Sequence, residues 1–79
     1  MKAKVYITPK AGILDPQGVT IERSLPALGF EGVHNVRVGK YIELELPAGD
    51  GAAEAVDQMC QKLLANPIIE DFEFELVPE

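Results

Sequence analysis

Hydrophobic and polar residues alternate in four short stretches of the chain, and each stretch predicts a β-strand. The stretches are residues 2–8, 33–38, 41–46 and 68–77. Gly39 and Lys40 are expected to form a tight connection or bulge between the second and third of them. The apolar faces of the first, third and last strands would be formed by Ala3, Val5 and Ile7; by Ile42, Leu44 and Leu46; and by Phe72, Phe74 and Leu76.

A helix is predicted from Pro16 to about Leu28. Asp15 is a strong N-terminal signal, because aspartate caps helices and proline fits the first helical position. Gly29 is a favourable residue for the C-terminal end. Pro26 has no amide hydrogen and its ring crowds the preceding turn, so a kink or an early end is expected there.

A second helix is predicted from Asp50, as its N-cap, to Ala65. Asn66 stops it, because a residue before proline is pushed out of the helical region. The apolar residues of this helix follow the spacing of a single stripe: Val56, Met59, Cys60, Leu63 and Leu64.

The predicted order of elements is β-α-β-β-α-β. This is the ferredoxin-like arrangement, an α+β fold in which two helices cover one face of an antiparallel sheet. No repeat, low-complexity segment or linker interrupts residues 1–79, so a single domain is expected.

The sheet face away from the helices is predicted to be rich in charge. Opposite charges on neighbouring strands contribute about 0.2–1 kcal/mol per pair, so this pattern is compatible with a solvated face. Its two tyrosines among paired charges also suit an association surface, and a dimer contact is slightly favoured. The residues on this face are Lys4, Tyr6, Tyr41, Glu43, Glu45, Glu73 and Glu75.

The length of the chain favours an oligomer. A domain of 79 residues buries only about 60% of the surface that its unfolded chain exposes, and small domains add disulfides, metals or further subunits. Cys60 is the only cysteine and His34 the only histidine, so neither a disulfide within the chain nor a tetrahedral metal site is expected. Association with other chains is therefore the expected source of extra buried area.

Thirteen acidic and seven basic residues give a net charge of −6, which disfavours binding to nucleic acids and to membrane surfaces. No signal peptide and no membrane-spanning run is predicted. A single unpaired cysteine fits a reducing compartment, so the cytoplasm is the expected location.

No catalytic site is predicted. His34 is interpreted as a surface histidine, and Cys60 as a buried packing residue. Lys10 and Gly12 precede a helix N-terminus, but the spacing is not that of a phosphate-binding loop and Asp15 would repel a phosphate. No metal site is expected.

The segment Arg37-Val38-Gly39-Lys40, followed by Tyr41, is the strongest candidate for a binding site. A plain hairpin would favour Asn-Gly or Asp-Gly at this position. Two cations around a glycine instead present hydrogen-bond donors near a backbone that bends easily. A structural turn and a contact to a partner or anion remain equally open. The candidate partner-binding residues are Arg37, Gly39, Lys40 and Tyr41.

Several blocks taken in order resemble the PurS family, the small subunit of phosphoribosylformylglycinamidine (FGAM) synthase. The resemblance covers Lys2 to about Val77. Pro26 departs from it, because an ordinary helix former is expected there. The most diagnostic blocks are Leu14 to Gly18, Val36 to Leu46, and Leu63 to Phe72.

This resemblance implies a function that composition does not show. FGAM synthase acts in de novo purine biosynthesis as a glutamine- and ATP-dependent ligase, with the synthetase site on PurL and the glutaminase site on PurQ. The resemblance implies that PurS has no active site and binds no cofactor itself, while ATP and Mg belong to the synthetase subunit. It further implies a dimer or tetramer that bridges PurL and PurQ and supports ammonia transfer.

Two alternatives share the predicted topology. One is a regulatory module that binds a small ligand. The other is a small hydrolase of the acylphosphatase type, which should carry an arginine in the loop after the first strand. That loop offers only Lys10, and the next arginine is Arg23 in the first helix. A metal chaperone would need paired cysteines and is excluded.

Overall fold

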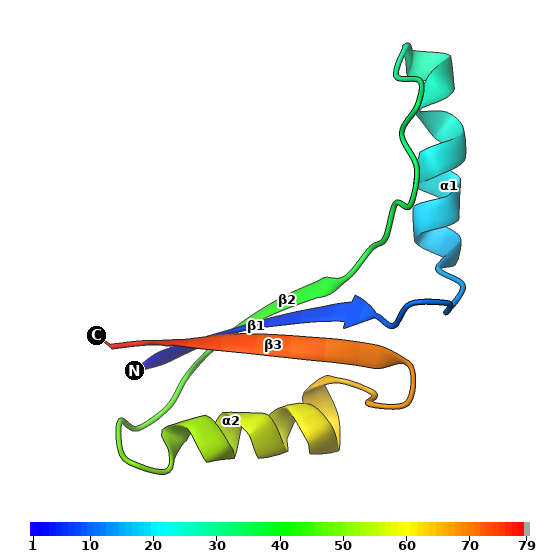
Figure 1. Cartoon of the computed structure of the whole chain (residues 1–79). Coiled ribbons are helices and arrows are strands. Elements are labelled where there is room, and N and C mark those ends of the chain that lie inside the picture. The colour runs from blue at the N-terminus through cyan, green and yellow to red at the C-terminus, as the bar shows by residue number, and fades with distance from the viewer. Residues whose placement is uncertain (79) are drawn as a thin grey trace.

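The computed structural model of the chain describes residues 1–78, which form a sheet of three strands, one helix beneath it, and an arm that projects from one end (Figure 1). Neither helix among these residues is long and apolar enough to cross a bilayer. In chain order the elements are β1 (Lys2–Pro9), α1 (Pro16–Ser24), the 3₁₀ helix η1 (Pro26–Leu28), β2 (Lys40–Glu45), α2 (Ala52–Met59), the π-helical turn η2 (Cys60–Leu64) and β3 (Glu70–Val77).

The three strands are antiparallel in the order β2-β1-β3, so β1 is central and both other strands are edges. Val5 lies opposite Ile42 on one side and Phe74 on the other. This register keeps the apolar residues of all three strands on one face, as their period of two predicts. The three predicted strands over 2–8, 41–46 and 68–77 are therefore confirmed, with small differences at their ends.

The core lies between the apolar face of the sheet and α2. Val5 and Ile7 of β1 are almost completely buried, as are Val56 of α2 and Cys60 of η2. Ile42 and Phe74, on the edge strands, remain only partly buried against this core. One helix is too narrow to cover three strands, which leaves the flanks of the apolar face partly open.

The second predicted helix is confirmed, although its start differs. Gly51, not Asp50, occupies the N-cap position, and no side chain caps this end. The helix ends in a π turn in which the Ala65 N–H donates to the Cys60 carbonyl at 2.9 Å. Asn66 before Pro67 then ends the helical run as predicted.

Two predictions for the first half of the chain are wrong. Residues 33–38 do not form a strand, and α1 does not lie on the sheet beside α2 (Figure 1). The full ferredoxin-like order is therefore absent from residues 1–78. Gly39 does not turn a hairpin either, because the chain runs through it directly into β2.

Residues 29–38 instead return along α1 and are held there by carboxylates. The Val36 N–H donates to Glu22 Oε1 at 3.1 Å, and the Val38 N–H donates to Asp15 Oδ2 at 2.5 Å. Asn35 has φ +58°, which interrupts the extended backbone that a strand needs. The amides of Val36 and Val38, which would join a sheet ladder, are thus bound by a residue of α1 and by the residue that precedes it.

The prediction of an early end at Pro26 is confirmed. The α-helix ends at Ser24, and the 3₁₀ helix η1 begins at Pro26. Gly29 adopts φ +94° and its N–H donates to the Pro26 carbonyl, so it closes the helical run as expected. We call residues 10–38, which contain α1, η1 and the return segment, the arm.

The arm makes the molecule long and thin, with extents of 49 × 28 × 14 Å. The radius of gyration is 16.0 Å, against about 12 Å for a compact domain of this length.

Candidate partner-binding site

Arg37 lies where the arm joins the sheet. Its Nη1 donates to the carbonyl of Pro9, the last residue of β1, at 3.0 Å. The guanidinium has five N–H donors, so this bond leaves further donors available. The side chain is exposed and lines a hollow of about 330 Å³ together with Tyr6 and Thr8 of β1 and Glu73 of β3.

Gly39 is required by close packing at the same junction. A Cβ on this residue would overlap the carbonyl of Ile7 in β1. Because Gly39 does not adopt a positive φ, its role is to let two backbones approach and not to reverse the chain. The predicted bend at Gly39 is thus replaced by a close contact.

Lys10 and Lys40 each form an ion pair with one of the first two residues of β3. Lys10 Nζ lies 2.7 Å from Asp71 Oδ1, and Lys40 Nζ lies 3.7 Å from Glu70 Oε2. Lys10 therefore has a carboxylate partner, in keeping with its interpretation as part of an ordinary loop. The two pairs join the end of β1 and the start of β2 to the start of β3, beside the arm.

Tyr41 lies on the open face of the sheet, opposite to α2. Its ring centroid is 5.2 Å from that of Tyr6, and its hydroxyl donates to Glu43 Oε1 at 2.7 Å. That hydrogen bond, with smaller contributions from desolvation and the Glu43 charge, raises the pKa of Tyr41 to about 12.

The structure brings together only part of the predicted set. Arg37 borders the open face, where it lines a hollow with Tyr6, one ring of the tilted pair that Tyr6 forms with Tyr41. Lys40 pairs with buried Ile7 and so lies on the opposite face of β2. Gly39 carries no side chain and shapes the junction.

The charged residues of the open face lie as predicted. Lys4 pairs in register with Glu43 on β2 and with Glu75 on β3, and all the glutamates of this face are exposed. Within residues 1–78, however, Lys4 does not approach a carboxylate within 4 Å, since the ion pairs at that distance are those of Lys10 and Lys40. Lys4 therefore lies opposite two glutamates in the sheet without forming a salt bridge to either of them.

The two residues considered for catalysis are placed as predicted. His34 is exposed in the arm, with Nδ1 3.0 Å from the Gly32 carbonyl. Cys60 is fully buried, and burial, with a smaller effect of Asp57, raises the pKa of its thiol. A raised pKa lowers the fraction of reactive thiolate. No group of three or more metal-ligating side chains forms among the residues described.

Sequence reasoning missed the second role of Asp15. This residue precedes α1 as predicted, but its carboxylate makes no standard cap hydrogen bond and accepts one from the distant Val38 N–H. That bond, with smaller contributions from the amides of Gly18 and Gln17, lowers the pKa of Asp15. The Asp-Pro pair was a visible signal for a helix start, but nothing local marks a partner 23 residues away.

Comparison with known proteins decides the family. The family model of PurS, phosphoribosylformylglycinamidine (FGAM) synthase, matches residues 2–78. The chain belongs to the PurS family. A PurS subunit from Synechocystis is 45% identical over 92% of this chain and 75% of its own. PurS is a subunit of FGAM synthase, a ligase complex of purine biosynthesis.

Solved structures agree with this assignment. PurS from Bacillus subtilis is similar with a TM-score of 0.84 and 43% identity, covering 94% of each chain. A chain of the PurLQS structure from Thermotoga maritima is similar with a TM-score of 0.74 and 30% identity, covering 94% of this chain and 93% of that one. The arrangement of three strands and two helices is therefore that of a PurS fold.

Proposed function

We propose that this chain is the non-catalytic adaptor of an FGAM synthase complex in the cytoplasm, where it bridges a PurL synthetase and a PurQ glutaminase. The observation that carries the proposal is the similarity, over 94% of the chain, to a chain of a PurLQS structure. In this proposal the chain binds no cofactor, and ATP and Mg are used on PurL. The chain acts as a homo-oligomer, a dimer or tetramer.

The transfer of ammonia between two active sites explains why such a complex would need an adaptor. Ammonia released by a glutaminase must reach the synthetase site before water protonates and dilutes it. Holding the two sites together converts an encounter between separate molecules into a local transfer, and a closed junction keeps water away from the ammonia. An adaptor can therefore raise the yield without supplying a catalytic group.

The open face of the sheet and its border suit partner contact. Tyr6 and Tyr41 offer exposed aromatic area, and Arg37 lines the same hollow as Tyr6 and has N–H donors left over. Arg37 is proposed to bind a carboxylate of a larger subunit, since a guanidinium can hold both carboxylate oxygens at once. Lys40 would serve as a second positive charge on the other side of β2.

The test is a titration of this chain into PurL and PurQ from the same organism, with ATP and Mg present. FGAM formation is measured once with glutamine and once with ammonium as the nitrogen source. An adaptor raises the glutamine-dependent rate to a plateau at a fixed stoichiometry and leaves the ammonium-dependent rate unchanged. Equal effects on both rates, or no effect on either, would overturn the proposal.

A further inference from the structure

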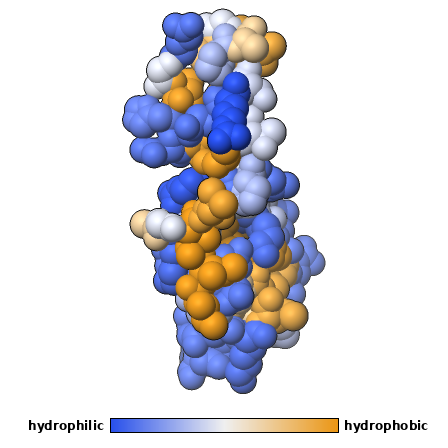
Figure 2. All heavy atoms as spheres, turned by 90° about the vertical axis from the view of Figure 1, so that its right-hand side faces the viewer, coloured by the Kyte–Doolittle hydropathy of each residue, from blue (hydrophilic) through white to orange (hydrophobic). Residues whose placement is uncertain are grey.

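The hollow beside Arg37 brings together side chains of opposite charge. It has a volume of about 330 Å³ and lies where β1 and β3 meet the arm. Thr8, Asp71 and Glu73 line it from the sheet, and Arg37 lines it from the arm. In the view of Figure 2, hydrophilic residues lie beside the narrow junction between the arm and the rest of the molecule. The hollow is therefore a polar feature, separate from the core.

The register of β1 and β3 fixes the floor of this hollow. Directly opposed residues of antiparallel strands project to the same face of the sheet. Ile7 points into the core, so its two neighbours on β1 point to the open face. Two register pairs therefore form the floor, Tyr6 with Glu73 and Thr8 with Asp71.

Arg37 is anchored beside this floor and keeps its charge unpaired. Its Nη1 donates to the Pro9 carbonyl at 3.0 Å, which is a neutral acceptor. Within residues 1–78 no carboxylate lies within 4 Å of the guanidinium, since the ion pairs at that distance are those of Lys10 and Lys40. The remaining N–H donors are available to a ligand.

The carboxylates of the hollow are not neutralised by Arg37 either. Glu73 forms no ion pair among residues 1–78, and Asp71 uses its Oδ1 for Lys10. Positive and negative groups thus line one hollow without reaching each other. A small molecule that carries both charges can bind both sides at once, which neither a simple anion nor a simple cation can do.

We propose that this hollow binds a free α-amino acid. The remaining donors of Arg37 hold the ligand carboxylate, since a guanidinium can bind both of its oxygens. Glu73 and the second oxygen of Asp71 accept hydrogen bonds from the α-ammonium group. The Thr8 hydroxyl can bond to either end of the ligand, and the exposed Tyr6 ring packs against its side chain.

A bound amino acid would compete with a larger subunit for Arg37. This consequence rests on the proposed function, in which the same donors bind a carboxylate of that subunit. One guanidinium cannot hold both carboxylates in this way, so an occupied hollow weakens assembly. The inference therefore adds a regulatory ligand to the adaptor role.

Binding is measured on the full chain alone, without PurL or PurQ, so its failure is distinct from a failure of the adaptor proposal. The probe is L-leucine, added in an NMR titration of the ¹⁵N-labelled chain. N-acetyl-L-leucine keeps the carboxylate but lacks the positive charge, and L-leucinamide keeps the ammonium group but lacks the carboxylate. L-leucine should bind at least about tenfold more tightly than either analogue, because each analogue leaves one side of the hollow without an opposite charge.

Two variants test the assigned groups. Arg37→Gln and Glu73→Gln should each weaken the binding of L-leucine at least about tenfold. Arg37→Gln should also remove the preference for L-leucine over L-leucinamide, and Glu73→Gln should reduce the preference over N-acetyl-L-leucine. Arg23→Gln in the arm and Glu45→Gln on β2 remove the same charges outside the hollow and should bind like the native chain. Circular dichroism checks that each variant is folded.

Several outcomes would overturn the amino-acid site. L-leucine at millimolar concentration that shifts no amide signal around Arg37 and Glu73 would show that the hollow does not bind it. N-acetyl-L-leucine that binds as tightly as L-leucine would leave only an anion site at Arg37. L-leucinamide that binds as tightly would leave only a cation site at the carboxylates.

The competition is tested separately in the complete system with PurL and PurQ. L-leucine should raise the concentration of this chain that gives half-maximal glutamine-dependent turnover, and it should leave the ammonium-dependent rate unchanged. If L-leucine binds the chain but does not change this concentration, the two carboxylates do not share Arg37 and the regulatory role is wrong.

Discussion

Gly18 of α1 lies so close to the carbonyl of Val36 that any Cβ at position 18 would overlap it. This contact allows the return segment to run along the helix, within reach of the Asp15 and Glu22 carboxylates. We expect Gly18→Ala to separate the two and to destabilise the fold by about 1–3 kcal/mol, the usual cost of forcing extra volume into a packed contact. Thermal unfolding measures this change.

Gly49 provides the matched control. An added Cβ there meets open space and Gly49 has no positive φ, so Gly49→Ala should leave the melting temperature unchanged or slightly raised. Equal melting temperatures for Gly18→Ala and Gly49→Ala would contradict the close contact.

The hydrogen bond from Val38 to Asp15 predicts a pH dependence of stability. The bond lowers the pKa of Asp15 in the folded chain. A carboxyl with a lowered folded pKa stabilises the fold above its unfolded pKa, and this contribution is lost as the pH falls through the folded value. Asp15→Asn should therefore lower the melting temperature clearly at pH 7 and much less in strong acid, well below the ordinary carboxyl pKa of 3.8. Glu31→Gln, at an exposed position in the arm, serves as the control. An equal loss at both pH values would show that the Asp15 charge has no part in this bond.

The sequence predicted the sheet well because its signal is local. In β1, β2 and β3 every second residue is apolar, and the structure places these residues on one face. Residues 33–38 carried a weaker pattern, with valines at 33, 36 and 38. Their conformation depends on bonds to Asp15 and Glu22, which lie 23 and 14 residues away from their partners. Spacing along the chain does not reveal such pairs.

The candidate partner-binding site was likewise predictable only where the signal is local in the sequence. The sequence identified Arg37 to Tyr41 as unusual, and the structure places this segment at the junction of arm and sheet. The split of Lys40 and Tyr41 onto opposite faces follows from strand alternation. The hydrogen bond from Arg37 to the Pro9 carbonyl could not be predicted from strand alternation, because it depends on how the arm leaves β1.

The hydrogen bond between Tyr41 and Glu43 predicts that the phenol of Tyr41 loses its proton only at unusually high pH. With its pKa raised to about 12, Tyr41 should remain protonated well above the usual range. A raised folded pKa means that the stabilisation is present below the unfolded value near 10 and is lost as the pH rises towards 12. Absorbance at alkaline pH in a Tyr6→Phe background isolates this phenol. Adding Glu43→Gln should move the titration down towards pH 10, and an unchanged midpoint would refute the role of Glu43.

The burial of Cys60 predicts slow reaction with thiol reagents. Cys60 is the only cysteine, so every labelling event reports this position. In the folded chain at pH 8 the thiol should react far more slowly than in denaturant, because its pKa is raised and the reagent reaches it only after local opening. Labelling of the native chain as fast as that of the denatured chain would show that Cys60 of η2 is not buried in the core.

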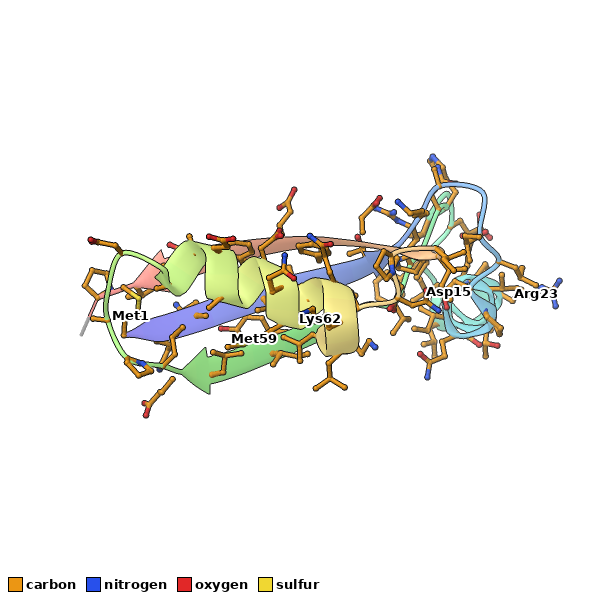
Figure 3. All side chains as sticks on the ribbon, turned by 90° about the horizontal axis from the view of Figure 1, so that it is seen from below. Met1, Asp15, Arg23, Met59 and Lys62 are labelled. Atoms are coloured by element: carbon orange, nitrogen blue, oxygen red, sulfur yellow. The ribbon has the colours of Figure 1, made fainter. Side chains whose placement is uncertain are left out.

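The proposed contact of Arg37 with a larger subunit predicts a defect in assembly and not in folding. We expect Arg37→Ala to raise the concentration of this chain that gives half-maximal glutamine-dependent turnover by about tenfold, equivalent to about 1.4 kcal/mol of binding. The melting temperature should fall little, since the side chain is exposed and makes one hydrogen bond to Pro9. Arg23 points away from the sheet on the far side of the arm (Figure 3), so Arg23→Ala removes the same charge and is the control. If both variants require the same concentration as the native chain, Arg37 ties the arm to β1 and contributes nothing to the partner contact.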